Sequence, residues 1–488
     1  MPASSPLPGI TPRAGRMPDR RNRLTFAVLA TGVALYGLLQ SLLAPVLPTV
    51  QQHLHTSQNT VTWVITSYLV AASVFTPIMG RVGDMIGKRR ILILSFACLA
   101  VGLLLAAVAT SIGVMIVARV IQGLGGGLLP LAFGVIRDDF PPARVAGAIG
   151  ALSALLGAGV GAGLVLAGPI ENHLGYAWLF LVPMLIGAIG TVAAYLVLPE
   201  SPGRLPGRIG WPAVLLLTGW LVALLIGVSQ APSWGWLSVE VLGLIALAAV
   251  LAAIWVVVET RSEYPLIDMR MMRIPAVWTS NVVALLLGVG LYAAFAFIPQ
   301  FVQTPPVNGY GFGASVTESG LMTVPQAIAV FVIGLLASGL ARRFGAKRLV
   351  TTGATIVVVP FLILAFAHSE KWEIVLATGL LGVGIGLVFA TLPNIIVGAV
   401  PPEQTGVATG MNANIRNIGG AIGTAAVSTI VTSTVQSDGF ATEAGYRWGF
   451  TMLAITSGIT VIACLLIPVA HATPPPQPAA ATEAAPAR

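Results

Sequence analysis

Fourteen long apolar runs restrict the fold of this 488-residue chain more than any other feature. A helix needs about 20 mostly apolar residues to cross the hydrocarbon core, because every backbone amide in lipid must be satisfied within its own segment. Only 9% of the residues are charged, whereas soluble globular proteins carry about a quarter. We therefore predict an all-α polytopic membrane protein with 14 transmembrane helices. The predicted spans lie near residues 25–48, 60–80, 91–110, 112–134, 145–168, 176–197, 210–229, 237–258, 277–300, 317–341, 348–367, 373–394, 405–432 and 446–468.

The basic residues sort strongly between the two sides of this arrangement. An even number of spans puts both termini on one side, and 21 of the 25 Lys and Arg residues then share that side. Short cytoplasmic loops collect positive charge, so we expect a multi-pass protein of a bacterial cytoplasmic (inner) membrane with both termini in the cytoplasm. The net charge of +8 follows from topology and anionic lipid, and no nucleic-acid partner is expected.

The two ends of the chain and its two cysteines add little chemistry. Residues 1–24, rich in Pro and Arg, predict a disordered cytoplasmic arm, and residues 469–488 a disordered cytoplasmic tail. Cys98 and Cys464 both fall in apolar runs, so no disulfide or metal site is expected. No His/Asp or His/Glu cluster at catalytic spacing occurs within a span, which disfavours a membrane enzyme and gives no reason to expect a cofactor.

An internal repeat predicts the domain organisation. The stretch "GRVGDMIGKRR" at 80–90 recurs as "SGLARRFGAKR" at 338–348, where Arg342 replaces Asp84. Likewise "LLPLAFGVIRDDFPPARVAG", ending at Gly147, resembles "ATLPNIIVGAVPPEQTGVATG", which contains Gly406. An offset of 258 to 263 residues throughout favours duplication over chance. We expect an N-terminal six-helix bundle at 25–197, a linker with two extra transmembrane helices at 198–276, and a C-terminal six-helix bundle at 277–468.

Several motifs together carry a family resemblance. The stretch from Gly80 to Arg89 resembles the signature of the major facilitator superfamily, and "RVIQGLGGG" at 119–127 resembles its fourth-span motif. With "WVITSYLV" at 63–70 and "NIRNIGGAIG" at 414–423, the chain is similar to the fourteen-span drug/proton antiporter branch. The resemblance implies the major facilitator fold and alternating access. It further implies a conformational gate that locks the cytoplasmic ends of the two halves together. The implied gate residues are Gly80, Asp84, Gly87, Lys88 and Arg89; the alternative is a turn that only sets topology.

Two arginines lie within apolar runs. An arginine at the centre of a span costs at least about 2.5–3.5 kcal/mol on insertion scales, so it should face a cavity or a partner. Arg119, with Gln122 one turn further on, holds a position that the resemblance ties to proton coupling or to a polar network; the alternative is snorkelling to an interface. Arg416 joins a stripe of asparagines, including Asn412. Because no acid opposes either arginine, we hypothesise anionic or amphiphilic substrates.

Glycines in the fifth span form two overlapping small-xxx-small pairs on adjacent faces of one helix. Antiporters of the resembled branch carry a Gly-Pro-rich motif here, but in this chain the Gly-Pro step falls on Gly163 and Leu164, and an actual Gly-Pro follows later. The expected helix-packing hinge consists of Gly157, Gly159, Gly161, Gly163, Gly168 and Pro169. Tight helix packing alone is the simpler explanation.

The first span lacks the acid that the resemblance leads us to expect. The matching position is Leu39, and no acid lies deep in any predicted span. Glu318 is the best remaining candidate for a coupling carboxylate, although an acid in a first helical turn is more often stabilised by the helix dipole.

The expected substrate cavity combines aromatic and uncharged polar residues, which is the usual chemistry of a promiscuous pocket. Its candidates are Tyr36, Gln40, Trp63, Tyr68, Phe133, Asn281, Tyr292, Phe295, Gln300, Asn394 and Asn412. We predict a monomeric exporter of drug-like or amphiphilic small molecules, in contact with membrane lipids and driven by proton antiport. One alternative exports lipid or an anionic metabolite with atypical coupling; another, of a different class, is a transport-inactive membrane sensor.

Overall fold

The computed structural model describes residues 19–56, 58–61, 63–200, 210–263, 265–434 and 440–468. The predicted arm at 1–24 and tail at 469–488 lie outside these residues, except for 19–24. Those six residues belong to helix α1, so the prediction of disorder was wrong for them. Asn22 is buried there, which a disordered arm would not provide.

The N-terminal helices span residues 19–197. They are α1 (Asp19–Ser41), α4 (Trp63–Ile86), α5 (Lys88–Ala107), α6 (Ile112–Gly123), α7 (Leu128–Asp139), α8 (Pro142–Leu174) and α9 (Trp178–Val197). A short 3-10 turn, η1 (Leu124–Gly127), joins α6 to α7, and the three together form one span.

The remaining long helices span residues 211–465. They are α10 (Trp211–Trp234), α11 (Val239–Arg261), α13 (Pro275–Gln303), α14 (Val316–Phe344), α15 (Ala346–Phe366), α16 (Lys371–Ala399), α17 (Thr405–Thr432) and α18 (Glu443–Leu465). Short helical pieces connect them and the first helices. These are α2 (Leu47–His53), α3 (Gln58–Val61), α12 (Met269–Met272), η2 (Pro306–Asn308) and η3 (Pro402–Gln404).

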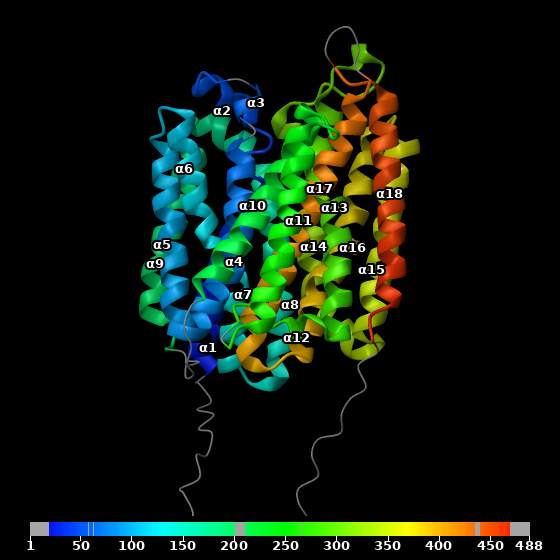
Figure 1. Cartoon of the computed structure of the whole chain (residues 1–488). Coiled ribbons are helices and arrows are strands. Elements are labelled where there is room, and N and C mark those ends of the chain that lie inside the picture. The colour runs from blue at the N-terminus through cyan, green and yellow to red at the C-terminus, as the bar shows by residue number, and fades with distance from the viewer. Residues whose placement is uncertain are drawn as a thin grey trace, which may run out of the picture.

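The long helices stand roughly side by side in two groups (Figure 1). The first group, drawn blue to cyan, surrounds one buried apolar core, and the group from α13 to α18 surrounds another. Helices α10 and α11 lie in front of the junction, where α10 packs on α4 and α17. Helix α1 begins and α18 ends at the same face, which we call the terminal face; the other is the opposite face. The predicted all-α architecture is confirmed.

Thirteen helices within the described residues are long and apolar enough to cross a membrane, against fourteen predicted spans. The difference is α17, which has 28 residues but carries Asn412, Asn414, Arg416 and Asn417. These four side chains are buried against protein, and α17 packs on α13 and α4. Neighbouring helices therefore cover the polar stripe that lowers the hydropathy of α17.

The repeated stretches have the same backbone shape. Gly87 ends α4 and begins α5 at φ 110°, and Gly345 ends α14 and begins α15 at φ 88°. Only glycine adopts this left-handed region without strain, so one residue turns the chain in each copy. The stretch at 80–90 is therefore not the loop that we predicted, because α4 continues as helix to Ile86.

Candidate functional site

Asp84 lies where the two groups of helices meet at the terminal face. It is buried near the C-terminal end of α4, and it faces the first turn of α17. A Cβ placed on Gly406 would lie 3.4 Å from Asp84 Oδ2, and one placed on Gly80 would lie 3.2 Å from the Gly406 carbonyl oxygen. Neither carboxylate oxygen accepts a hydrogen bond from the described residues. The positive end of the α17 dipole therefore stabilises the Asp84 charge.

Two cations complete this contact. Lys88 Nζ lies 3.6 Å from Asp84 Oδ1 and 2.5 Å from Asp138 Oδ2, so it joins α4, α5 and α7. Arg137 crosses to the other group of helices. Its guanidinium donates to the Thr405 hydroxyl at 2.5 Å and to the Val400 carbonyl at 2.8 Å. Helices α4 and α7 thereby hold the start of α17, and we call this contact the α4–α17 seam.

Arg89 has a different position from the other predicted gate residues. It donates to the Tyr195 carbonyl at 2.6 Å, near the end of α9, within the same group of helices. In the second copy, Lys347 donates to the Leu465 carbonyl at 2.7 Å, at the end of α18. A cation placed at a helix C-terminus satisfies a carbonyl that has no partner within its own helix. Arg89 therefore contacts no residue of the second group through these bonds.

A second contact between the groups has the equivalent place in the repeat. Ser338, which aligns with Gly80, lies beside α8: a Cβ on Gly147 would lie 3.8 Å from Ser338 Oγ. Asn394 Nδ2 of the neighbouring helix α16 also donates to the Ala146 carbonyl of α8 at 3.2 Å. We call this contact of α8 with α14 and the adjacent part of α16 the α8–α14 seam. Arg342 is exposed there, in place of the buried Asp84 of the first seam.

The glycines of α8 face two different neighbours. A Cβ on Gly157 or Gly161 would lie 2.3 Å from Val330 or Ala327 of α14, respectively. A Cβ on Gly159 or Gly163 would lie 2.3 Å from Ala34 or Ser41 of α1. The two small-xxx-small pairs therefore allow close approach on adjacent faces, one within the N-terminal group and one between the groups. A moving hinge stays a prediction.

The Gly-Pro step of α8 lies near the opposite face. Gly168 touches the start of α14, where a Cβ would lie 2.7 Å from the Thr317 hydroxyl, and Asn172 Nδ2 donates to the same hydroxyl at 3.4 Å. Pro169 lies inside the helix, which continues to Leu174, beyond the predicted end of the span. Nearby, His53 stacks on Tyr176 with 4.0 Å between ring centroids, and burial raises the pKa of the Tyr176 hydroxyl.

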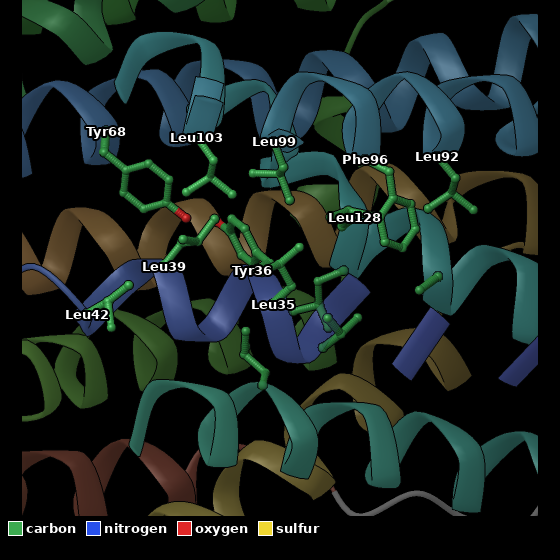
Figure 2. Packing of buried hydrophobic residues seen from close by; sticks show 14 of the residues in the cluster. Leu35, Tyr36, Leu39, Leu42, Tyr68, Leu92, Phe96, Leu99, Leu103 and Leu128 are labelled. Carbon is green, nitrogen blue, oxygen red and sulfur yellow. The ribbon is translucent and has the colours of Figure 1, made fainter. Parts of the chain in front are cut away.

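Arg119 is almost fully buried in the N-terminal group. Its guanidinium donates to the Val64 carbonyl at 2.9 Å, to Gln122 Oε1 at 2.6 Å and to the Leu39 carbonyl at 3.4 Å. It also lies 4.2 Å above the Tyr68 ring. Backbone oxygens and one amide satisfy this cation in place of a carboxylate, and no snorkelling to an interface occurs. The side chain of Leu39, at the position of the missing acid, packs in the apolar core (Figure 2).

A small cavity lies between the two groups, with room for water but not for a drug-sized molecule. Three predicted cavity residues, Gln40, Tyr292 and Phe295, line it together with Arg416. The Tyr292 hydroxyl lies 2.8 Å from both Gln40 Oε1 and Asn417 Oδ1, so it bridges α1, α13 and α17. The rest of the lining is Leu156, Gly157, Val160, Gly161, Leu291, Gln326, Ala327, Val330, Ile385 and Phe389.

The other eight predicted cavity residues do not line this closed cavity, and their part in a substrate cavity stays a prediction. Tyr36, Tyr68 and Phe133 are packed in the apolar core of the N-terminal group, where Figure 2 shows the two tyrosines with Leu39. Asn412 donates to Asn281 Oδ1 at 2.9 Å, which holds α17 to α13. Gln300 is exposed, and Asn394 contributes to the α8–α14 seam. Trp63 begins α4 outside the cavity lining.

The coupling role of Glu318 also stays a prediction. It lies in the first turn of α14, and its exposed carboxylate pairs with Lys371 Nζ at 2.5 Å. Exposed pairs of this kind contribute about 0–1 kcal/mol. Glu318 does not line the cavity, which contains no acidic residue.

Three residues that the sequence did not single out have clear places in the site. Arg137 looked like one more cation on the basic side, and only the position of Thr405 at the start of α17 reveals its role. Gln326 and Phe389 line the cavity, but α14 and α16 are apolar on several faces, so periodicity does not distinguish the cavity-facing one. Gln326 is a polar residue in an apolar span, and this was the sequence signal that could have indicated a cavity-facing position.

Comparison with known proteins agrees with this architecture. The model of the Major Facilitator Superfamily matches residues 29–424 and 282–488. The chain belongs to the Major Facilitator Superfamily. It is therefore a multi-pass membrane transporter, and the resemblance predicted from its motifs is confirmed. The crystal structure of the human organic anion transporter MFSD10 (TETRAN) matches with a TM-score of 0.65 at 16% identity, over 92% of this chain and 100% of that one, which shows a shared fold.

Several relatives within the superfamily have names that refer to resistance and export. The Tetracenomycin C resistance and export protein of Streptomyces glaucescens is 28% identical over 84% of this chain and 76% of its own length. The Multidrug resistance protein B homolog of Mycobacterium tuberculosis is 29% identical over 77% of this chain and 70% of its own length. The Multidrug resistance protein Stp of the same species is 28% identical over 83% of this chain and 75% of its own length.

Proposed function

We propose that this transporter exports drug-like or amphiphilic small molecules across a bacterial cytoplasmic membrane by alternating access, in exchange for protons. The observation that carries the proposal is the cavity between the two helix groups. Aromatic, apolar and polar side chains line it together with the charged Arg416, and this mixture binds diverse amphiphiles. The resistance and export names of the relatives support the same function.

The terminal face is the cytoplasmic face in this proposal, because the described part of that face holds most of the Lys and Arg residues. The α4–α17 seam then closes the cytoplasmic entrance through Asp84 and Arg137, while α8 and α14 close the opposite entrance near Thr317. A substrate enters when the α4–α17 seam opens and leaves when the contact near Thr317 opens. Because the α4–α17 seam and the contact near Thr317 lie at opposite faces, rocking the groups can open one entrance while the other stays closed.

Proton antiport is the finer part of the proposal. Arg119, Gln122 and the Leu39 carbonyl form a buried polar network on the N-terminal side, where the resembled branch places an acid at the position of Leu39. Without that acid, the proton must be carried by a residue that reaches water only when the transporter opens. The carboxylate of Asp84 is buried at the seam and loses its contact with α17 on opening, which makes it our candidate.

Transport by purified full-length protein in proteoliposomes tests both parts. We expect amphiphilic dyes and drugs from a broad panel to accumulate on one side, faster when the pH gradient drives protons in the other direction. No movement of any compound would contradict the transporter function itself. Movement that is indifferent to the pH gradient would contradict proton coupling alone.

A further inference from the structure

Arg416 is a buried cation that reaches the wall of the cavity between the two groups of helices. Only 8% of the residue is exposed, and its guanidinium lies 4.9 Å from the centroid of the Phe389 ring at the wall of the cavity. Within the described residues, no carboxylate lies within ion-pair distance of it, and no acid lines the cavity. A cation–π contact offsets only part of the cost of burying a charge.

Two amide side chains line the cavity together with Arg416. One is Gln326 of α14, which is 5% exposed. Gln40 Nε2 is buried without a partner in the same wall. The Tyr292 hydroxyl has one proton and cannot donate to both Gln40 and Asn417, so one of these amides must donate to it. Three helices therefore present hydrogen-bond donors to one small space.

Arg119 shows what a guanidinium with a purely structural role has in the same chain. Two carbonyls and the Gln122 amide accept its hydrogen bonds, and an aromatic ring covers its face. Arg416 has the aromatic ring and a hydrogen bond with the Tyr292 hydroxyl but, among the residues that the structure describes, neither backbone carbonyls nor a carboxylate. A guanidinium has five N–H donors, so Arg416 has donors left for a ligand, and planar guanidinium groups bind carboxylate or phosphate oxygens in pairs.

We propose that Arg416, with the amide of Gln326 beside it, binds the anionic head group of the transported molecule. This inference rests on the proposed function and names its substrate class: amphiphiles with a carboxylate or phosphate head and an apolar body. Phe295, Phe389 and Val330 supply the apolar wall for that body. The head group accepts hydrogen bonds from these donors, and opening of either entrance provides the room that the closed cavity lacks.

Three probes that share one ring system separate charge from shape. They are 2-naphthoate, the neutral 2-naphthamide and the cationic 2-naphthylmethylammonium ion, measured by displacement of radiolabelled 2-naphthoate from purified full-length protein. Because a hydrogen bond to a charged group contributes about 1.5–3 kcal/mol, we expect 2-naphthoate to bind about tenfold or more tighter than either other probe. Equal affinities, or a preference for the cation, would overturn the inference.

Arg416→Gln removes the charge and should reduce the affinity for 2-naphthoate to that for the amide. The matched control is Arg447→Gln, because Arg447 also stacks on a ring, Phe366, at 4.9 Å, but is exposed on α18. The control should keep the full preference. A preference that survives Arg416→Gln, or that both variants lose equally, would contradict the proposal. If Arg416→Gln does not yield monodisperse protein, Arg416→Lys is the deciding variant. A several-fold loss of affinity for 2-naphthoate with an unchanged affinity for 2-naphthamide supports the site, whereas equal losses of affinity for both probes overturn it.

Two further experiments identify whether the head group belongs to a lipid or to a soluble anion, and they test the anion site separately from the transport function. In nanodiscs, displacement of 2-naphthoate by added phosphatidylglycerol would assign the site to lipid head groups, and no displacement would assign it to soluble organic anions. In proteoliposomes, intact Arg416-dependent binding without movement of any probe would contradict the transport function and leave the anion site standing. Transport of cationic probes that does not depend on Arg416 would support the transport function and contradict the anion site.

Discussion

The two seams at the terminal face are built on the same plan and differ in charge. In each, a helix of one group ends at a glycine with positive φ, and the next helix begins directly after it. In each, a cation two residues further on donates to a carbonyl at the end of the last helix of that group. The α4–α17 seam alone adds a buried acid, Asp84, whereas the α8–α14 seam has exposed Arg342 at the equivalent position. The shared features are therefore structural, and the buried acid is the feature that distinguishes the α4–α17 seam from the α8–α14 seam.

Asp84→Asn should remove the difference in charge between the two seams, and we expect it to have the largest effect on the closed state. Loss of the charge beside the α17 N-terminus removes up to about 2 kcal/mol from the closed state, enough for a tenfold or larger shift toward an open terminal face. Spin-label distances between α4 and α17, together with transport rates, would measure it. The matched variant Arg342→Asn should leave both unchanged. An equal opening by the two variants would show that the acid has no special role.

Gly87→Ala and Gly345→Ala should sharpen the comparison, because they test the shared features. No atom lies within 4 Å of a Cβ at either position, so the cost is backbone strain alone, about 1–2 kcal/mol in the free energy of unfolding. Thermal unfolding of the two purified variants should show similar losses. A large loss in one and none in the other would contradict the structural equivalence of the two turns.

Gly80→Ala tests how closely the α4–α17 seam must pack. Its Cβ would lie 3.2 Å from the Gly406 carbonyl oxygen, so the helices must separate by a few tenths of an ångström, at a cost of about 1 kcal/mol to the closed state. We expect a several-fold change in transport rate. Ser338→Ala, at the equivalent place in the other seam, removes an atom and should be neutral. Wild-type transport by Gly80→Ala would show that this approach is not critical.

Arg89→Ala and Lys347→Ala should have the smallest effects. Each removes a hydrogen bond at a helix C-terminus, which contributes about 0.5–1 kcal/mol. Arg89→Ala also removes an exposed ion pair with Glu200 and a ring contact with Tyr195, which add little. Melting temperatures should fall slightly and by similar amounts, while the charge preference of transport stays as in the wild type. A strong loss of transport in Arg89→Ala alone would place Arg89 in the gate, as the family resemblance implied.

The sequence predicted the spans because hydropathy is a property of each segment, and it predicted the repeat because glycines that turn a chain leave fixed spacings. It did not predict most of the cavity. Tyr36 and Tyr68 look like cavity residues by type, but the rotation of α1 and α4 directs them into the N-terminal core. Gln326 and Phe389 become cavity residues because Gly157 and Gly161 bring α8 against α14, and such a rotation depends on contacts between distant segments. Arg137 was missed for the same reason.

The polarity of α17 also has a consequence for how the protein is made. Its asparagines and arginine keep it from partitioning into lipid by itself, although it lies at the centre of the finished molecule. Helices α4 and α13 precede α17 in the chain, so both are already made when α17 is synthesised and can cover its polar side. Insertion of α17 therefore depends on its neighbours, and substitutions on the faces of α4 or α13 that cover α17 should lower the amount of protein in the membrane.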